Sequence, residues 1–248
     1  MRLASADLHI HSALSPCADE EMAPESIVYA AVARELDIIA VCDHNCAGNT
    51  AAIQEAAHAI AGEYLCVIPG MEITTAEEAH ILGLFPDAPC AMSVSDELAE
   101  HLPLTGPEGN PFGDQPLMNA QGLIVGRADR LLSFATNLSL NQVVDLIRQH
   151  QGLVVAAHID RPSFSILSQL GMIPDDVRFD ALEISAAGYA QGHHMQFKAL
   201  GIPLITSSDA HYVQNIGDAR TSFLLKDPSF DEICLAFQDK LGRTCYLA

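Results

Sequence analysis

Nine residues that can bind a metal ion recur along the chain, most of them where apolar runs end. Six of the eleven histidines belong to this set, whereas chance would scatter histidines over helices and surface loops. Neutral imidazole, carboxylate and thiolate are the side-chain ligands of zinc and related divalent metals. The candidate ligands are His9, His11, Cys17, His44, Glu72, His80, His158, Asp209 and His211.

Two of these histidines lie close to the first residue. Alternation around Leu8 and Ile10 predicts a short strand that carries His9 and His11 on one face. An isolated His-x-His pair is better explained as two polar residues on the solvent side of an edge strand. The other candidate ligands favour a metal site here.

The number of donors exceeds the need of one ion, because a catalytic zinc takes three protein ligands and a water. Two or three divalent ions with shared ligands are therefore expected, and the two oxygens of Glu72 make it the natural bridge. Neighbouring ions suit hydrolysis at phosphorus, because they activate a bridging water to hydroxide, bind phosphate oxygens and stabilise the leaving oxygen. The sequence holds no G-x-S-x-G, Walker A or H-E-x-x-H motif.

Apolar runs typical of buried strands alternate with segments of helical periodicity about seven times. This order predicts an α/β fold with a parallel sheet. A closed barrel is expected, because the candidate ligands terminate strands and no glycine-rich dinucleotide turn follows any strand. Besides the first, strands are expected at 37–42, 64–68, 79–85, 152–157, 180–184, 202–207, 220–225 and 243–247. Helices are expected at 24–36, 48–61, 140–150, 163–170, 191–200 and 230–241.

Residues 86–140 interrupt this alternation and contain six prolines. Within them, residues 115–118 and 122–125 flank a polar turn and predict a small hairpin. We expect a single domain over 1–248 in which residues 86–140 are inserted. The insertion is either a lid over the site or a plain surface excursion.

The composition bounds the partners and the compartment. The 248 residues carry a formal net charge of −20, so the surface is expected to repel long nucleic acids and anionic membranes. A small phosphorylated substrate is expected instead, because bound cations can invert the local potential. Seven cysteines without a C-x-x-C pair, no secretory signal and no long apolar run predict a cytoplasmic protein with free thiols. The oligomeric state is left open.

Six short motifs occur in order between about residues 5 and 215, and together they resemble those of the PHP (polymerase and histidinol phosphatase) family. The resemblance implies a distorted (β/α)7 TIM-like barrel, a site for Zn, Mn or Fe with up to three ions, and phosphoester hydrolysis. The motifs are Asp7-Leu8-His9-Ile10-His11-Ser12, Cys42-Asp43-His44-Asn45, Pro69-Gly70-Met71-Glu72, Ala79-His80, Ala157-His158 and Ser208-Asp209-Ala210-His211.

The resemblance also implies an assignment of ligands to ions. Many family members have histidine where this chain has Cys17, and thiolate binds zinc or iron well but manganese poorly. Cys17 therefore either shifts the metal preference, leaves its site weak, or is an inert thiol in a turn. By position, His9, His11, Glu72 and Asp209 hold one ion; Glu72, His80 and His158 hold a second; His44, His211 and Cys17 hold a third.

Three further residues are candidates to support the site. Arg161, which follows His158 closely, could grip a substrate phosphate or form a loop salt bridge with Asp160 or another acid. Asp7 and Asp43 could fix the tautomer of an imidazole or cap turns.

The expected function is a metal-dependent phosphoesterase that acts on a small phosphorylated metabolite or nucleotide. Glu72, Asp209 and Arg161 are the expected catalytic residues. One alternative is an amidohydrolase-like enzyme that cleaves C–N bonds with a carboxylated lysine or a glutamate as bridge. Lys198 is the only lysine among the first 225 residues, which favours the glutamate. The other alternative is a metal-binding module without enzymatic activity.

Overall fold

The computed structural model describes residues 1–106 and 109–247, so residues 107 and 108 of the predicted insertion and residue 248 lie outside the described part. The strands are β1 (Arg2–Ile10), β2 (Ile38–Val41), β3 (Cys66–Thr74), β4 (His80–Leu84), β5 (Pro116–Met118), β6 (Ile124–Arg127), β7 (Leu153–Ala156), β8 (Ala181–Ile184), β9 (Leu204–Thr206), β10 (Thr221–Leu225) and β11 (Thr244–Leu247). The α-helices are α1 (Pro24–Ala33), α2 (Thr50–Ala61), α3 (Ala88–Ala99), α4 (Leu140–Gln149), α5 (Ile166–Leu170), α6 (Ala186–Ala190) and α7 (Phe230–Phe237).

Nine strands form one curved sheet in the order β11-β10-β1-β2-β3-β4-β7-β8-β9. Seven of them share a direction, whereas β4 and β10 run antiparallel to both of their neighbours. The expectation of a wholly parallel sheet was therefore wrong. Because β4 returns directly from β3 as a hairpin, its first residue, His80, lies beside Thr74 at the end of β3. His80 thus begins a strand and still reaches the rim formed by the carboxyl ends of the others.

The sheet closes at this rim. β1 pairs with β10 only over Arg2–Ala6. Further along, Ile10 forms a parallel bridge to Ala210, and the His11 amide donates to the Ala210 carbonyl at 3.0 Å. At the seam, β9 lies against β11. The prediction of a distorted, TIM-like α/β barrel is confirmed.

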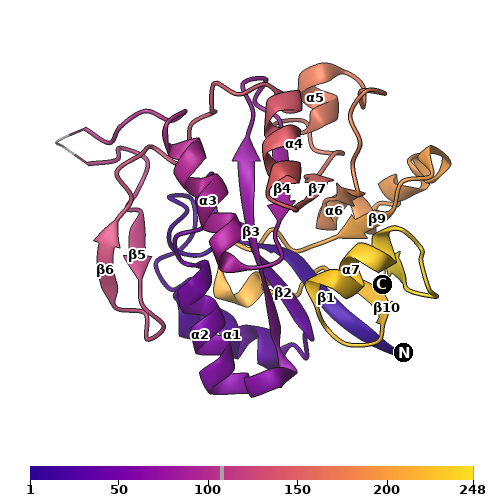
Figure 1. The fold of residues 1–248 in the computed structure, drawn as a ribbon, viewed down its shortest axis with the longest axis horizontal. Helices are drawn as coiled ribbons and strands as arrows, with labels where there is room; N and C mark the ends of the chain where they lie inside the picture. Colours follow the sequence, from indigo (N-terminus) through magenta and orange to yellow (C-terminus); the bar gives the residue numbers. More distant parts are fainter. Residues whose placement is uncertain (107–108, 248) are drawn as a thin grey trace.

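One hydrophobic core lies inside the curved sheet, because eight strands from β1 to β10 contribute side chains to it. A second core joins the outer face of β1, β2 and β3 to α1 and α2, and a third joins β3, β4 and β7 to α3 and α4 (Figure 1). Strand β2 contributes to both faces: Ile38 and Ala40 point inward, while Ile39 and Val41 pack under the helices. Such fully buried strands explain the unbroken apolar runs of the sequence.

A β-bulge in β1 changes the predicted alternation. The register between β1 and β2 shifts between Asp7 and Ile10. Leu8 therefore lies in the inner core and Ile10 in the outer one, although both were expected on one face. Bulges beside active sites commonly re-aim a side chain. Here the bulge leaves His9 and His11 together and turns Asp7 away from them.

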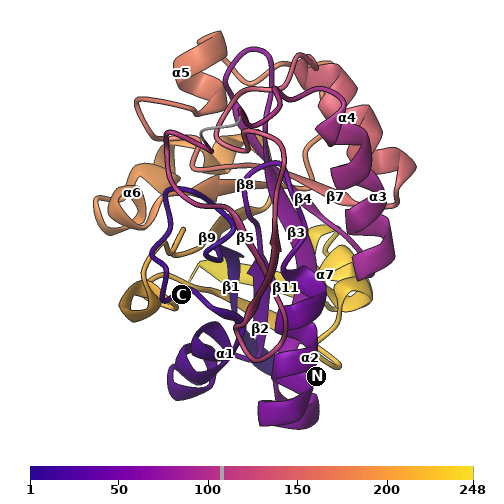
Figure 2. The same cartoon turned by 90° about the vertical axis from the view of Figure 1, so that its left-hand side faces the viewer.

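The segment 86–140 differs in part from its prediction. The hairpin β5–β6 is present and hangs at one edge of the molecule, beside α3 (Figures 1 and 2). Helix α3 was not predicted; Asp87 caps it by accepting from the Cys90 amide, and Pro89 occupies its first turn. The expected helix over 191–200 is two 3-10 turns, because Gly192 adopts φ 80° and ends the helical path after α6. No described helix has both the length and the apolar character needed to cross a membrane.

Candidate metal centre

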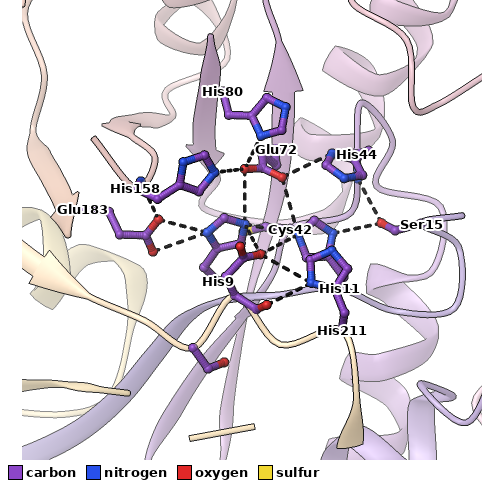
Figure 3. Close-up of polar contacts among 12 residues, drawn as sticks. His9, His11, Ser15, Cys42, His44, Glu72, His80, His158, Glu183 and His211 are labelled. Atoms are coloured by element: carbon purple, nitrogen blue, oxygen red, sulfur yellow. Dashed lines mark hydrogen bonds and ion pairs between the residues drawn. The ribbon is translucent and has the colours of Figure 1, made fainter. Parts of the chain in front are cut away.

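Glu72 lies at the centre of the candidate ligands (Figure 3). One of its oxygens, Oε1, lies 2.8 Å from His80 Nδ1 and 3.0 Å from His158 Nε2. The other, Oε2, lies 3.2 Å from His44 Nδ1 and 3.4 Å from His11 Nε2. The two oxygens thus face different imidazoles. A carboxylate placed in this way can bridge two ions.

His9 and His11 form the floor of the centre, and both side chains are fully buried. Their Nε2 atoms face each other at 3.2 Å, and Asp209 Oδ1 lies 3.4 Å and 3.1 Å from them. Ligands of one tetrahedral zinc at about 2.0–2.1 Å lie roughly 3.3 Å apart. The donor spacing is therefore the spacing that a shared ion requires.

An unpaired atom gives a second test of fit. His44 Nδ1 is buried and makes no hydrogen bond in the described part of the chain, although Glu72 Oε2 is 3.2 Å away. Buried polar atoms are nearly always paired, so such an atom requires an explanation. A divalent cation held by His44, Glu72 and His80 would supply the missing partner.

The described residues form three groups whose donor atoms lie within 4.8 Å of one another. Eight of the nine predicted ligands lie in these groups or, for His158, directly against Glu72. Cys17 joins none of the three groups and lies in an exposed turn. Its role as a ligand stays a prediction. The groups are His9, His11 and Asp209; His44, Glu72 and His80; and His11, His44 and His211.

Charge within the centre favours ionised carboxylates and two neutral imidazoles. Burial opposes ionisation of Glu72, but His80 and His9 hold its pKa well below the usual range. Burial also lowers the pKa of His211 to about 4, with a further contribution from His11. The pKa of His44 is lowered for the same reasons. Ligand imidazoles must be neutral to bind a metal, so His44 and His211 are poised for it.

Backbone strain gathers at the same place. His158 has φ 30° and Asp209 has φ 51°, which place both in the left-handed region that residues other than glycine rarely adopt. Asn45, next to His44, has φ 51°, and its side chain donates to the carbonyls of Leu132 and Phe134. Strained residues that the surrounding structure holds in place are typical of functional sites.

Two residues that the sequence did not single out hold the floor histidines. The Glu183 carboxylate accepts from His9 Nδ1 at 3.0 Å and from the His158 amide at 3.0 Å. The Ser15 hydroxyl lies 3.0 Å from His11 Nδ1 and donates to Asp43 at 2.7 Å. Fixing each Nδ1–H outward leaves Nε2 free to face the centre.

The glutamate of β8 can be tested directly. Glu183→Gln is expected to weaken zinc affinity by about 10- to 100-fold, because the amide no longer fixes the His9 tautomer as a carboxylate does. Competition with a chromophoric chelator measures this affinity. Unchanged affinity would mean that the Glu183–His9 contact is only structural.

Each of the three supporting candidates, Asp7, Asp43 and Arg161, was given two possible roles, and the structure shows which contacts each one makes. Asp7 accepts from the amides of Ser208 and Gly217 and from the Ser208 hydroxyl, so it holds turns, and within the described residues its carboxylate makes no hydrogen bond to an imidazole. Asp43 reaches His11 only through Ser15. Arg161 forms its salt bridge with Asp209, at 2.6 Å from Nη1 to Oδ2, and lies at the mouth of the centre.

Comparison with known proteins places this centre in context. A family model described as PHP-associated matches residues 197–240, and no curated protein matches the chain. The predicted resemblance to the PHP family is confirmed over these residues. The match covers the 3-10 turn before β9, the Asp209–His211 segment and the strand and helix that follow.

Solved structures share the barrel. The lesion-specific endonuclease Q from Pyrococcus furiosus superposes with a TM-score of 0.69 at 18% identity, over 98% of this chain and 58% of its own. A protein of Bifidobacterium adolescentis described as a putative metal-dependent phosphoesterase gives 0.56 at 20% identity, over 83% and 87%. An amidohydrolase from Chromobacterium violaceum gives 0.59 at 18%, over 86% and 90%. This chain thus spans less than two thirds of the endonuclease, and identities this low show the fold alone.

One expectation about partners was wrong. The net charge was taken to exclude long nucleic acids and leave a small phosphorylated substrate. Yet an endonuclease Q complex holds a 27-mer duplex with an abasic lesion at its active site, and it superposes on this chain with a TM-score of 0.68 at 18% identity, over 98% of this chain and 58% of its own. Net charge sums the whole surface, whereas a phosphate meets the local potential, which bound cations and Arg161 can make positive.

Proposed function

We propose that the chain is a metal-dependent hydrolase that cleaves phosphate esters, and that two or three divalent ions of zinc, manganese or iron occupy the centre. The observation that carries the proposal is Glu72, whose two oxygens lie between separate sets of imidazoles. The PHP-associated match and the structural likeness to a phosphoesterase and an endonuclease support it. When bound, such ions supply Lewis acidity, which lowers the pKa of water and neutralises phosphoryl oxygens.

The chain's own residues supply the rest. Glu72 and Asp209 keep the centre anionic, so it attracts divalent cations. Glu183 and Ser15 orient His9 and His11. Arg161 uses one nitrogen for Asp209, and its side chain is 39% exposed, so further N–H groups can donate to a phosphate oxygen.

A nucleic-acid phosphodiester is one substrate class within this proposal, favoured by the likeness to the endonuclease bound to duplex DNA. A C–N hydrolase is the second candidate function, favoured by the likeness to the amidohydrolase. Assays on bis(p-nitrophenyl) phosphate, p-nitrophenyl phosphate, duplex DNA with an abasic site and an N-acyl amino acid separate these classes. The protein is stripped with chelator and reloaded with Zn²⁺, Mn²⁺ or Fe²⁺ before each. Hydrolysis of no phosphate ester with any of the metals would contradict the proposal.

Arg161 provides a sharper test of phosphate binding. Arg161→Ala is expected to lower kcat/KM for the diester by about tenfold or more, because a charge-assisted hydrogen bond to the phosphate is lost. Arg127→Ala is the matched control, since Arg127 also pairs with a carboxylate, Asp114 at 2.8 Å, but lies on the hairpin. Equal losses in both variants would remove Arg161 from the phosphate site.

A further inference from the structure

The mouth of the centre carries an aromatic side chain beside its cation. Exposure rises from His9 and His11, which are buried, through His211 to Arg161 at 39% and Phe164 at 45%. The opening of the centre therefore lies on the side of Arg161 and Phe164. Both residues belong to the loop between His158 and α5.

Phe164 is fixed against a candidate ligand. Its ring stacks on the His80 imidazole with a centroid distance of 5.0 Å and an interplanar angle of 21°. Its carbonyl accepts from the His80 amide at 2.8 Å. Since His80 covers one face of the ring, the exposed area belongs to its edges and its opposite face.

Packing does not account for this position. Phe164 belongs to none of the hydrophobic cores formed by the described residues. Its φ of 55° lies in the left-handed region, which is costly for a bulky residue. Hydrogen bonds from the Arg161 amide to the His158 carbonyl and from the Ser165 hydroxyl to the Arg161 carbonyl hold the loop in this strained form. An exposed aromatic ring that is held in place beside the metal centre can contact a bound ligand.

We propose that Phe164 determines specificity by stacking on a planar aromatic group of the substrate, a nucleobase, whose phosphate Arg161 binds. The inference rests on the proposed phosphoesterase function and names the group attached to its phosphate. A flat ring backed by a second flat ring favours another flat group over a sugar or an alkyl chain. The phenylalanine side chain has no hydrogen-bonding atom, so it can stack on any base and does not discriminate between bases.

Binding to the zinc-loaded protein tests the inference without turnover. Calorimetry compares thymidine 5′-monophosphate with 2-deoxyribose 5-phosphate, which carries the same phosphate ester and no base. The nucleotide is expected to bind on the order of tenfold more tightly, and adenosine and thymidine monophosphates to bind alike within a few-fold. Equal affinity of the nucleotide and the sugar phosphate would overturn the proposal.

Variants locate the preference. Phe164→Leu keeps an apolar cover on His80 and is expected to erase the preference for the nucleotide, whereas Phe164→Trp keeps it. Tyr64→Leu is the control, because Tyr64 is an exposed aromatic residue just before β3, at the opposite end of that strand from the centre. A preference that survives in a folded, zinc-containing Phe164→Leu protein would also overturn the proposal. If Phe164→Leu does not fold, loss of the preference in Phe164→Trp would do so.

The two proposals can fail separately. Lack of hydrolysis of every phosphate ester tested by the metal-loaded wild-type protein contradicts the proposed function, whatever the binding results. Hydrolysis with no advantage for a base-bearing ligand contradicts the role of Phe164 alone.

Discussion

Glu72→Gln is expected to reduce turnover of a phosphodiester on the order of a thousandfold and to lower the bound metal. Glu72 is buried and faces imidazoles with both oxygens, so the carboxylate is the anion that the site shares among its donors. Glutamine keeps the size but removes the charge and one acceptor oxygen. Its amide hydrogens would also point at nitrogen atoms that need a positive ion. The loss corresponds to about 4 kcal/mol, a plausible size for charge stabilisation at a metal centre.

Elemental analysis of the purified protein and kcat for bis(p-nitrophenyl) phosphate measure the two effects. The matched control is Glu232→Gln. Glu232 is a largely buried glutamate of α7, away from the centre, and its carboxylate pairs with Arg243 at 2.8 Å. That variant is expected to lose some stability and to keep its metal. A Glu72→Gln protein with full metal and full turnover would refute the bridging role.

The proximity of the candidate ligands could be predicted because they follow or begin strands, and a barrel gathers those positions at one rim. Glu183 was missed for a local reason. It lies within the apolar strand β8, whose residues are all buried, and nothing in its neighbours indicates a polar partner. A glutamate inside a buried strand was the one available indication, since such a charge requires a partner.

The orientation of β4 was missed because the preceding strand was expected to end at residue 68, which leaves room for a new unit. In the structure β3 continues to Thr74, and the five residues before His80 are too few for a parallel connection. Helix α3 was missed because Pro89 was interpreted as a break, although proline is favoured in the first turn of a helix. The wrong expectation about nucleic acid has a different cause. The net charge is a property of the whole surface, and it was used as if it gave the electrostatic potential at the site.

Removing the metal is expected to reverse the pH dependence of stability between pH 6.5 and 9. Burial alone would lower the pKa of His11, but hydrogen bonds to Asp209 and Glu72 outweigh it and raise the pKa to about 9. A histidine whose pKa is higher in the folded state stabilises the fold fully below its unfolded value near 6.5. That contribution is lost as the pH rises through 9 and amounts to about 3 kcal/mol. His9 shifts in the same direction.

Below about pH 8.5 the other shifted groups titrate outside this window, and above it the cysteines, whose pKa values burial raises, add a loss of the same sign. Burial raises the pKa of Asp7 to about 6, so the stability linked to its protonation is already lost at pH 6.5. The pKa values of His44 and His211 are lowered, so these groups change stability only below about pH 6.5. Chelated protein should therefore melt at progressively lower temperature from pH 6.5 to 9. Metal-loaded protein should not, because metal and proton compete for the same imidazole nitrogens and the metal binds more tightly as the pH rises.

Thermal unfolding at several pH values, with chelator or with excess Zn²⁺, measures both slopes. His11→Gln should flatten the slope of the chelated protein, whereas His58→Gln, which changes an exposed histidine of α2, should leave it unchanged. Parallel slopes with and without metal would mean that the protons on His9 and His11 do not compete with the ion. The centre would then bind its metal through other donors, and the role assigned to the floor histidines would have to be abandoned.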